Sequence, residues 1–84
     1  MKTVEFSRHA LIQMSERGAN QHEVIETIRT GEKVPAKKGR RGYRKNFQYN
    51  ADWAGRFFLT KQVLAIVVEE CDRLVVITVY TFYF

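Results

Sequence analysis

The chain has 84 residues, enough for one small domain, and its 45% hydrophobic and 27% charged residues are ordinary for a folded protein. This composition excludes a disordered or collagen-like chain, and the single cysteine excludes a disulfide framework. Fourteen Lys and Arg residues against nine Asp and Glu residues give a net charge of +5, which favours a polyanion such as nucleic acid as the partner.

The first third of the chain has the apolar spacing of two helices. Ser7 is a good N-cap, because its hydroxyl can accept a hydrogen bond from a free backbone N–H of the first turn. Gly18 stands where a helix ends in the left-handed conformation. Asn20 then begins a second capped helix, which Gly31 ends. Residues 7–31 are therefore predicted to form a hairpin of two helices.

Residues 32–42 are predicted to form a loop, because they contain the only proline and two glycines. Beyond this loop the apolar residues recur with a period of two, which indicates strands joined by short connections in an antiparallel meander. We expect four strands, over Tyr43–Tyr49, Arg56–Thr60, Val63–Glu69 and Leu74–Phe82. Residues 1–84 are thus expected to form one α+β domain, with the helical hairpin packed on a four-stranded antiparallel sheet in residues 43–84.

The last predicted strand is apolar on both of its faces. Strict alternation gives two sets of side chains that point in opposite directions, namely Leu74, Val76, Thr78, Tyr80 and Phe82 against Val75, Ile77, Val79, Thr81 and Tyr83. A strand with one solvated face should alternate polar with apolar residues. We therefore expect the second face to be covered by the loop, by a second copy in a homodimer, or by a partner. The alternative is a central strand whose Thr and Tyr residues tolerate water.

A dense basic segment lies at the end of the predicted loop. Within nine positions it contains Lys37, Lys38, Arg40, Arg41, Arg44 and Lys45. Like charges this close repel one another, and they are favoured where they meet the phosphates of a nucleic acid. The aromatic residues Tyr43, Phe47 and Tyr49 follow and can stack on unpaired bases. The alternative is a solvated loop followed by aromatic core residues.

Four side chains are candidates for chemistry on a phosphodiester, namely His9, Arg17, Thr78 and Tyr80. His9, Gln13 and Arg17 are spaced by four, which places them on one stripe of the first helix. Histidine exchanges a proton near neutral pH, and arginine clamps a phosphate with two hydrogen bonds. The hydroxyls of Thr78 and Tyr80 on the last strand can help to position a phosphate. The alternatives are a surface or capping histidine and ordinary sheet residues.

The sequence leads us to expect no metal, no cofactor and no membrane segment. No Cys and His residues have the spacing of zinc ligands. The longest apolar run, Val63–Val68, has six residues, whereas a membrane helix needs about 20. The acidic Glu5 precedes any apolar stretch, so we expect no signal peptide and a cytoplasmic protein.

Several short motifs make the chain resemble a family of small bacterial proteins. They are Phe6-Ser7-Arg8-His9-Ala10, Met14-Ser15-Glu16-Arg17-Gly18 and the closing Val76-Ile77-Thr78-Val79-Tyr80. The family that they resemble is DUF4258, a domain of unknown function that is grouped with the RelE-like and barnase-like toxin ribonucleases. The resemblance covers nearly the whole chain, and it implies two N-terminal helices packed on an antiparallel sheet.

The resemblance also implies metal-independent RNA cleavage within a toxin–antitoxin system, with RNA or ribosome-bound mRNA as substrate and an antitoxin protein as partner. The matching positions are His9, Arg17, Thr78 and Tyr80. RNA cleavage at a 2′-hydroxyl needs a base, an acid and stabilisation of the phosphorane charge. His9 would then act as the base or the acid. Arg17, together with Arg44 or Lys61, would stabilise the charge.

Two other functions stay open. A non-catalytic nucleic-acid-binding module would depend on the basic segment and not on His9, and its affinity would fall steeply with salt. A protein-interaction domain would depend instead on the two-sided apolar strand and on the aromatic C-terminal residues Tyr80–Phe84.

Overall fold

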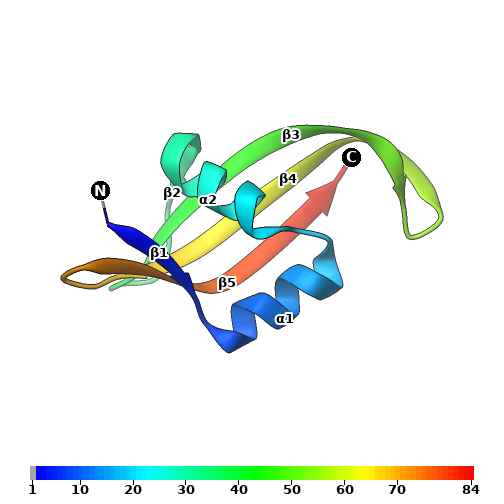
Figure 1. The fold of residues 1–84 in the computed structure, drawn as a ribbon. Helices are drawn as coiled ribbons and strands as arrows, with labels where there is room; N and C mark the ends of the chain where they lie inside the picture. The colour runs from blue at the N-terminus through cyan, green and yellow to red at the C-terminus, as the bar shows by residue number, and fades with distance from the viewer. Residues whose placement is uncertain (1) are drawn as a thin grey trace.

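Two helices and five strands make up the fold of the computed structural model, which describes residues 2–84 (Figure 1). The α+β class predicted from the sequence is confirmed. In chain order the elements are β1 (Thr3–Phe6), α1 (Arg8–Arg17), α2 (Gln21–Thr30), β2 (Glu32–Val34), β3 (Arg41–Trp53), β4 (Arg56–Glu69) and β5 (Arg73–Tyr83).

Local capping determines where both helices begin. The Ser7 hydroxyl oxygen accepts a hydrogen bond from the Ala10 N–H at 3.0 Å. At the second helix the Asn20 side chain accepts from the Glu23 N–H at 2.8 Å, and the Glu23 carboxylate accepts from the Asn20 N–H at 3.1 Å. Between the helices Gly18 has a φ of 77°, the left-handed conformation that favours glycine. The predicted caps are therefore confirmed.

The sheet is mixed and has five strands, whereas the sequence predicted four antiparallel strands. Its order is β1-β5-β4-β3-β2, and β1 pairs with β5 in parallel. The antiparallel meander of β3, β4 and β5 agrees with the prediction. The strands β1 and β2 have only four and three residues, too few for a periodic pattern. The pairing partner of Thr3 is Arg73, so distant residues decide that this segment is a strand.

The second and third predicted strands are one continuous strand, β4. The polar residues Lys61 and Gln62 lie between the two predicted strands and interrupt their apolar pattern. Both residues instead continue the ladder, Lys61 opposite Phe47 and Gln62 opposite Asn46. The prediction was wrong here because the Lys61 ammonium group is accommodated inside the fold, where it binds the Glu23 carboxylate at 2.7 Å.

Both helices pack on one face of the sheet, α1 along β5 and α2 over β3 and β4 (Figure 1). The core between them consists of Ala10, Met14, Ala19, Val24, Ile28, Tyr43, Val63, Ala65, Val67, Val76 and Val79. The ladder between β4 and β5 skips Ile77, which marks a β-bulge. Val76 and Val79 consequently both point into the core although they are three residues apart. The strict alternation predicted for this strand is wrong beyond Val76.

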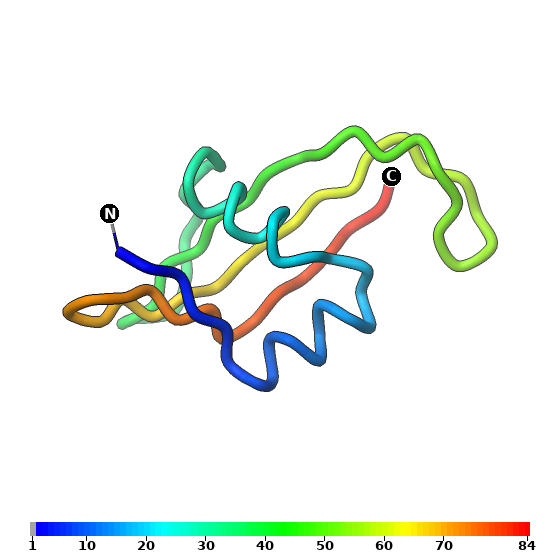
Figure 2. The backbone as a smooth tube through the Cα atoms, viewed as in Figure 1, coloured from blue at the N-terminus to red at the C-terminus, as the bar shows by residue number. Residues whose placement is uncertain are grey.

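The two ends of the sheet carry different connections. The hairpin that joins β3 and β4 projects beyond the helices at one end (Figure 2). At the other end, the loop between β2 and β3 lies beside the turn between β4 and β5 (Figure 2). There the Arg41 guanidinium contacts the Glu69 carboxylate at 2.6 Å. The predicted basic segment therefore starts at the end of the sheet where α1 also begins.

Candidate nucleic-acid interface

Two side chains from the predicted stripe on α1 form hydrogen bonds with the backbone of β5. The Gln13 side-chain oxygen accepts a hydrogen bond from the Val79 N–H at 2.9 Å, and the Arg17 guanidinium donates to the Val79 carbonyl at 2.7 Å. The Arg17 carbonyl accepts from the hydroxyls of Thr81 and Tyr83 at 2.8 and 2.7 Å. The strand β1 pairs with β5 only as far as Val76, so the backbone of β5 beyond that residue needs such partners. One role of the stripe is therefore to hold α1 against β5.

The opposite face of the sheet carries neither α1 nor α2. Strand register places its side chains in rows that cross β3, β4 and β5. We call three successive rows the open face: Gly42–Ile66–Thr78, Arg44–Leu64–Tyr80 and Asn46–Gln62–Phe82. The two aliphatic side chains at its centre are half-buried, and aromatic and polar side chains flank them.

Two exposed aromatic rings on β5 are the main feature of the open face. Tyr80 is 41% exposed and Phe82 is 47% exposed. Their ring centroids are 6.5 Å apart, and the ring planes differ by 22°. The Arg17 guanidinium carbon lies 5.1 Å from the centroid of the Tyr80 ring, within the range of a cation–π contact. Nearly parallel rings beside a cation provide a surface on which unpaired bases can stack.

Three of the four predicted catalytic residues lie together, and His9 lies apart from them. Arg17 contacts the Tyr80 ring, and Thr78 occupies the neighbouring row of the same strand. His9 is exposed on the first turn of α1. Eight residues separate it from Arg17, which corresponds to about 12 Å along the helix axis. A ligand held by Arg17 and Tyr80 must therefore extend along α1 to reach His9.

Five of the seven predicted phosphate-binding residues are exposed: Lys37, Lys38, Arg40, Arg41 and Arg44. The last two have carboxylate partners. Arg41 pairs with Glu69, and Arg44 pairs with Glu32. The hydrogen bond from Lys2 and the nearby charge of Arg41 lower the pKa of the Glu69 carboxyl from its ordinary 4.5. Part of the basic charge at this end of the sheet is thus neutralised within the protein.

The three cations that precede β3, Lys37, Lys38 and Arg40, form what we call the basic loop. Arg44 belongs to the Tyr80 row of the open face, and Arg41 lies three residues earlier on β3, about 10 Å away along the strand. The basic loop therefore begins just beyond the open face. A single nucleic-acid strand of a few nucleotides can contact both surfaces.

The other two predicted phosphate-binding residues lie on the face of the sheet that the helices cover. The Lys45 ammonium group binds the Thr30 hydroxyl at 2.6 Å and the Glu26 carboxylate at 3.0 Å. Lys61 is only 6% exposed, and its ammonium group donates to the Gly18 carbonyl and to the Glu23 carboxylate, each at 2.9 Å. The geometry gives both lysines contacts within the fold, between the helices and the sheet.

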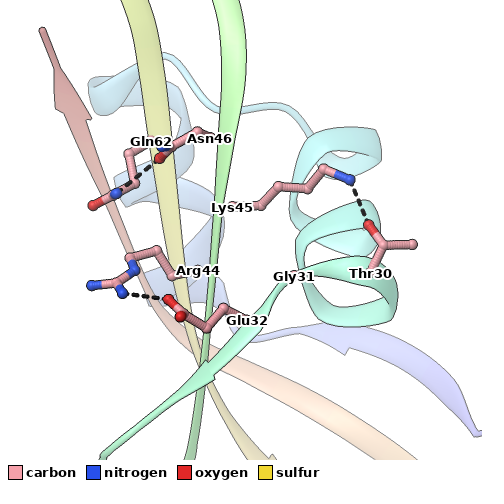
Figure 3. Close-up of a pocket in the computed structure, with 7 residues that line it drawn as sticks. All are labelled: Thr30, Gly31, Glu32, Arg44, Lys45, Asn46 and Gln62. Atoms are coloured by element: carbon pink, nitrogen blue, oxygen red, sulfur yellow. Dashed lines mark hydrogen bonds and ion pairs between the residues drawn. The ribbon is translucent and has the colours of Figure 1, made fainter.

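A polar groove of about 340 Å³ lies where α2 ends and β2 begins (Figure 3). It is lined by Thr30, Gly31, Glu32, Arg44, Lys45, Asn46 and Gln62. The Gln62 amide nitrogen donates to the Asn46 side-chain oxygen at 2.8 Å. This amide pair and Arg44 lie on one side of β3, and Lys45 lies on the other (Figure 3). The groove thus joins the open face to the edge of the sheet.

Three residues of the open face were not predicted as site residues from the sequence, namely Asn46, Gln62 and Phe82. The alternation of polar Asn46 and Gln48 with aromatic residues on β3 indicates a solvated face. It does not indicate which residues of β4 and β5 share that face, because strand register and the bulge at Ile77 decide this.

Residues 2–84 contain no group of three or more His, Cys, Asp or Glu side chains that could hold a metal ion. Neither helix in this range has the length and apolar character required to span a membrane. A family model described as "Domain of unknown function (DUF4258)" matches residues 6–81. Neither the curated proteins nor the solved structures contain a match.

Proposed function

The chain belongs to the DUF4258 family, and from the geometry above we propose that it binds single-stranded RNA on the open face of its sheet. The observation that carries this proposal is the pair of exposed, nearly parallel rings of Tyr80 and Phe82, with the Arg17 guanidinium over the first. Sequence-specific RNA recognition mostly uses unpaired bases, which stack on aromatic and guanidinium planes. Each stacked base contributes about 1–3 kcal/mol.

The charge distribution supports the same proposal. The protein has a net charge of +5, and the basic loop places three exposed cations beside the open face. Each phosphate that a cation neutralises releases bound counterions, so that affinity falls as salt rises. Bases would therefore occupy the rings, and phosphates would contact Lys37, Lys38 and Arg40.

The test is the affinity of a labelled single-stranded RNA, measured by fluorescence anisotropy. Tyr80→Ala and Phe82→Ala should each weaken binding about 5-fold to 150-fold, the equivalent of one lost stacking contact. Phe57→Ala is the matched control, because Phe57 is 57% exposed but lies on the projecting β3–β4 hairpin. Replacing the three cations of the basic loop by alanine should reduce the salt slope by about 2.

Two results would overturn the proposal. One is the absence of RNA binding, and the other is an equal loss in the Phe57 and Tyr80 variants. If RNA does not bind, and light scattering shows a dimer that Tyr80→Ala converts to a monomer, the open face serves a second copy of the chain instead.

We propose RNA cleavage as a second candidate function, because Arg17, Thr78 and Tyr80 lie together at one edge of the open face. The Tyr80 hydroxyl would act as an acid, and Arg17 would stabilise the charge of the phosphorane. His9 would contribute as a base only to RNA that extends along α1. The packing of two N-terminal helices on the sheet supports the grouping with RelE-like and barnase-like ribonucleases, and this grouping is part of the proposal.

Cleavage and binding can be separated with Tyr80→Phe, which keeps the stacking ring and removes the hydroxyl. This variant should bind RNA like the wild type and cleave it about 100-fold to 10,000-fold more slowly, both measured in EDTA. His9→Ala tests the second group in the same assay. If the wild-type protein binds RNA and cuts neither free nor ribosome-bound message, the cleavage proposal is wrong and the binding proposal stands.

A further inference from the structure

The amide pair Asn46 and Gln62 lies in the same row of the open face as Phe82. The three residues are register partners on β3, β4 and β5 and point to the same face of the sheet. Neighbouring strands are about 4.8 Å apart, so the side chains of Gln62 and Phe82 leave the backbone about one strand spacing from each other. The ring and both amides therefore border the place that a base stacked on Phe82 would occupy.

The amide pair keeps hydrogen-bonding groups free for a ligand. Its internal bond, from the Gln62 nitrogen to the Asn46 oxygen at 2.8 Å, uses one donor and one acceptor site. A side-chain amide has two N–H donors and an oxygen with two acceptor sites. The pair therefore has further donors and acceptors to offer, and Asn46 is exposed while Gln62 is half-buried. The internal bond also fixes the orientation of both amides before a ligand arrives.

From this arrangement we infer that Asn46 and Gln62 read the edge of the base that stacks on Phe82, and that the base is adenine. This inference rests on the proposed RNA binding. Adenine presents its N6 amino group and its N7 acceptor side by side, and the amides of Asn and Gln match this pair with two hydrogen bonds. Phe82 supplies the stacking energy without selectivity, and the amides supply the selectivity.

The competing assignment on the open face is guanine, and the structure disfavours it at this position. Guanine is recognised most often by an arginine or lysine that donates to its O6 and N7 atoms. Arg44, which lies in the next row, is held by the Glu32 carboxylate, and Lys45 points to the other side of β3 (Figure 3). The side chains that share the row of Phe82 are thus amides and not cations.

The experiment compares short uridine oligomers in which one central base is replaced by adenine, guanine or cytosine. Anisotropy titrations should show the tightest binding to the adenine oligomer, by about 5-fold to 150-fold over guanine, since a bidentate pair discriminates by about 1–3 kcal/mol. Adenine and guanine are both purines, so their ratio removes most of the difference in stacking. In Gln62→Leu this ratio should fall to about 1, while the uridine oligomer keeps the wild-type affinity.

A matched control is Gln48→Leu, because Gln48 is an exposed amide on the same face of β3 that lies opposite Thr60 and not opposite Gln62. It should keep the preference for adenine. Equal binding of all four oligomers, a preference for guanine, or an adenine preference that survives in Gln62→Leu would overturn the inference and leave RNA binding intact. Failure to bind any oligomer would overturn the proposed function and this inference together.

Discussion

The buried ion pair between Lys61 and Glu23 leads to a prediction about stability. The ammonium group binds both carboxylate oxygens, at 2.7 and 2.9 Å, and also the Gly18 carbonyl at 2.9 Å. The exposed fractions of the two side chains are 8% and 16%. Lys61→Met fills the same space but leaves the carboxylate and the carbonyl without their donor. The fold should therefore depend on this lysine.

The expected magnitude follows from the burial. Removing one partner of a buried pair costs about 3–5 kcal/mol, and the partial exposure of Glu23 places this case near about 3 kcal/mol. A domain of this length has a total stability of roughly 4–13 kcal/mol. The melting temperature should consequently fall by roughly 12–24 °C. Lys45→Met is the control, because its pair with Glu26 is more exposed and should contribute less than about 1 kcal/mol.

Urea unfolding followed by the fluorescence of Trp53 measures these differences. Glu23→Gln belongs in the series, because glutamine keeps the capping interaction with Asn20 and removes only the charge. The double variant with Lys61→Met should be more stable than the sum of the two single losses indicates, by about 0.5–3 kcal/mol. If the losses in free energy of unfolding of the two single variants simply add in the double variant, the two side chains do not interact and the prediction is wrong. A loss of RNA affinity in folded Lys61→Met protein, with a smaller salt slope, would show that Lys61 contacts phosphate instead.

Three further predictions concern local features. Gly18→Ala should destabilise the domain more than Gly55→Ala, as measured by urea unfolding. Both positions have φ near 80°, a conformation that costs alanine about 1–2 kcal/mol. Only at Gly18 would the new methyl group also lie 2.7 Å from the Tyr83 hydroxyl oxygen. Equal losses would contradict this contact. Gln13→Met should lower the free energy of unfolding by about 1–3 kcal/mol and speed hydrogen exchange at the Val79 amide, because that amide loses its acceptor. Unchanged exchange would show that the Val79 amide donates to another group. Burial raises the pKa of the Tyr83 hydroxyl above its ordinary 10.0, so the folded state holds this proton more tightly than the unfolded state. The resulting stabilisation of the fold is present below about pH 10 and is lost as pH rises through the folded-state pKa. In Tyr83→Phe the urea midpoint should therefore fall less at alkaline pH than in the wild type. An equal fall in the variant would show that other groups cause the loss of stability.

Helix capping was predictable from the sequence because it depends on residues close together in the chain. The Asn20 side chain and the Glu23 backbone are three residues apart, and the interaction between them is present in the fold. The left-handed end at Gly18 is equally local. The alternation that begins near Tyr43 identified the meander for the same reason.

The candidate site was predicted only in part. Arg17, Thr78 and Tyr80 were identified and lie together, whereas the partners of Tyr80 on the open face were not. Phe82 was noted only as part of an apolar strand and an aromatic C-terminus that could bind a protein partner. Its neighbour Gln62 was assigned to a break between strands. Both assignments depend on register with other strands, which no short motif encodes.

The amino-acid sequence by itself determined the helices, their caps, the meander and the excess of basic charge, since each depends on neighbouring residues or on composition alone. Only the tertiary structure decided which charges stay on the surface and which bind partners inside the fold. The Gln13 side chain and the Val79 amide are 66 residues apart, and Lys61 and Glu23 are 38 apart. A lysine looks the same in a sequence whether water or a carboxylate surrounds it. Its role is settled only when packing brings distant segments together and either buries the charge or leaves it on the surface.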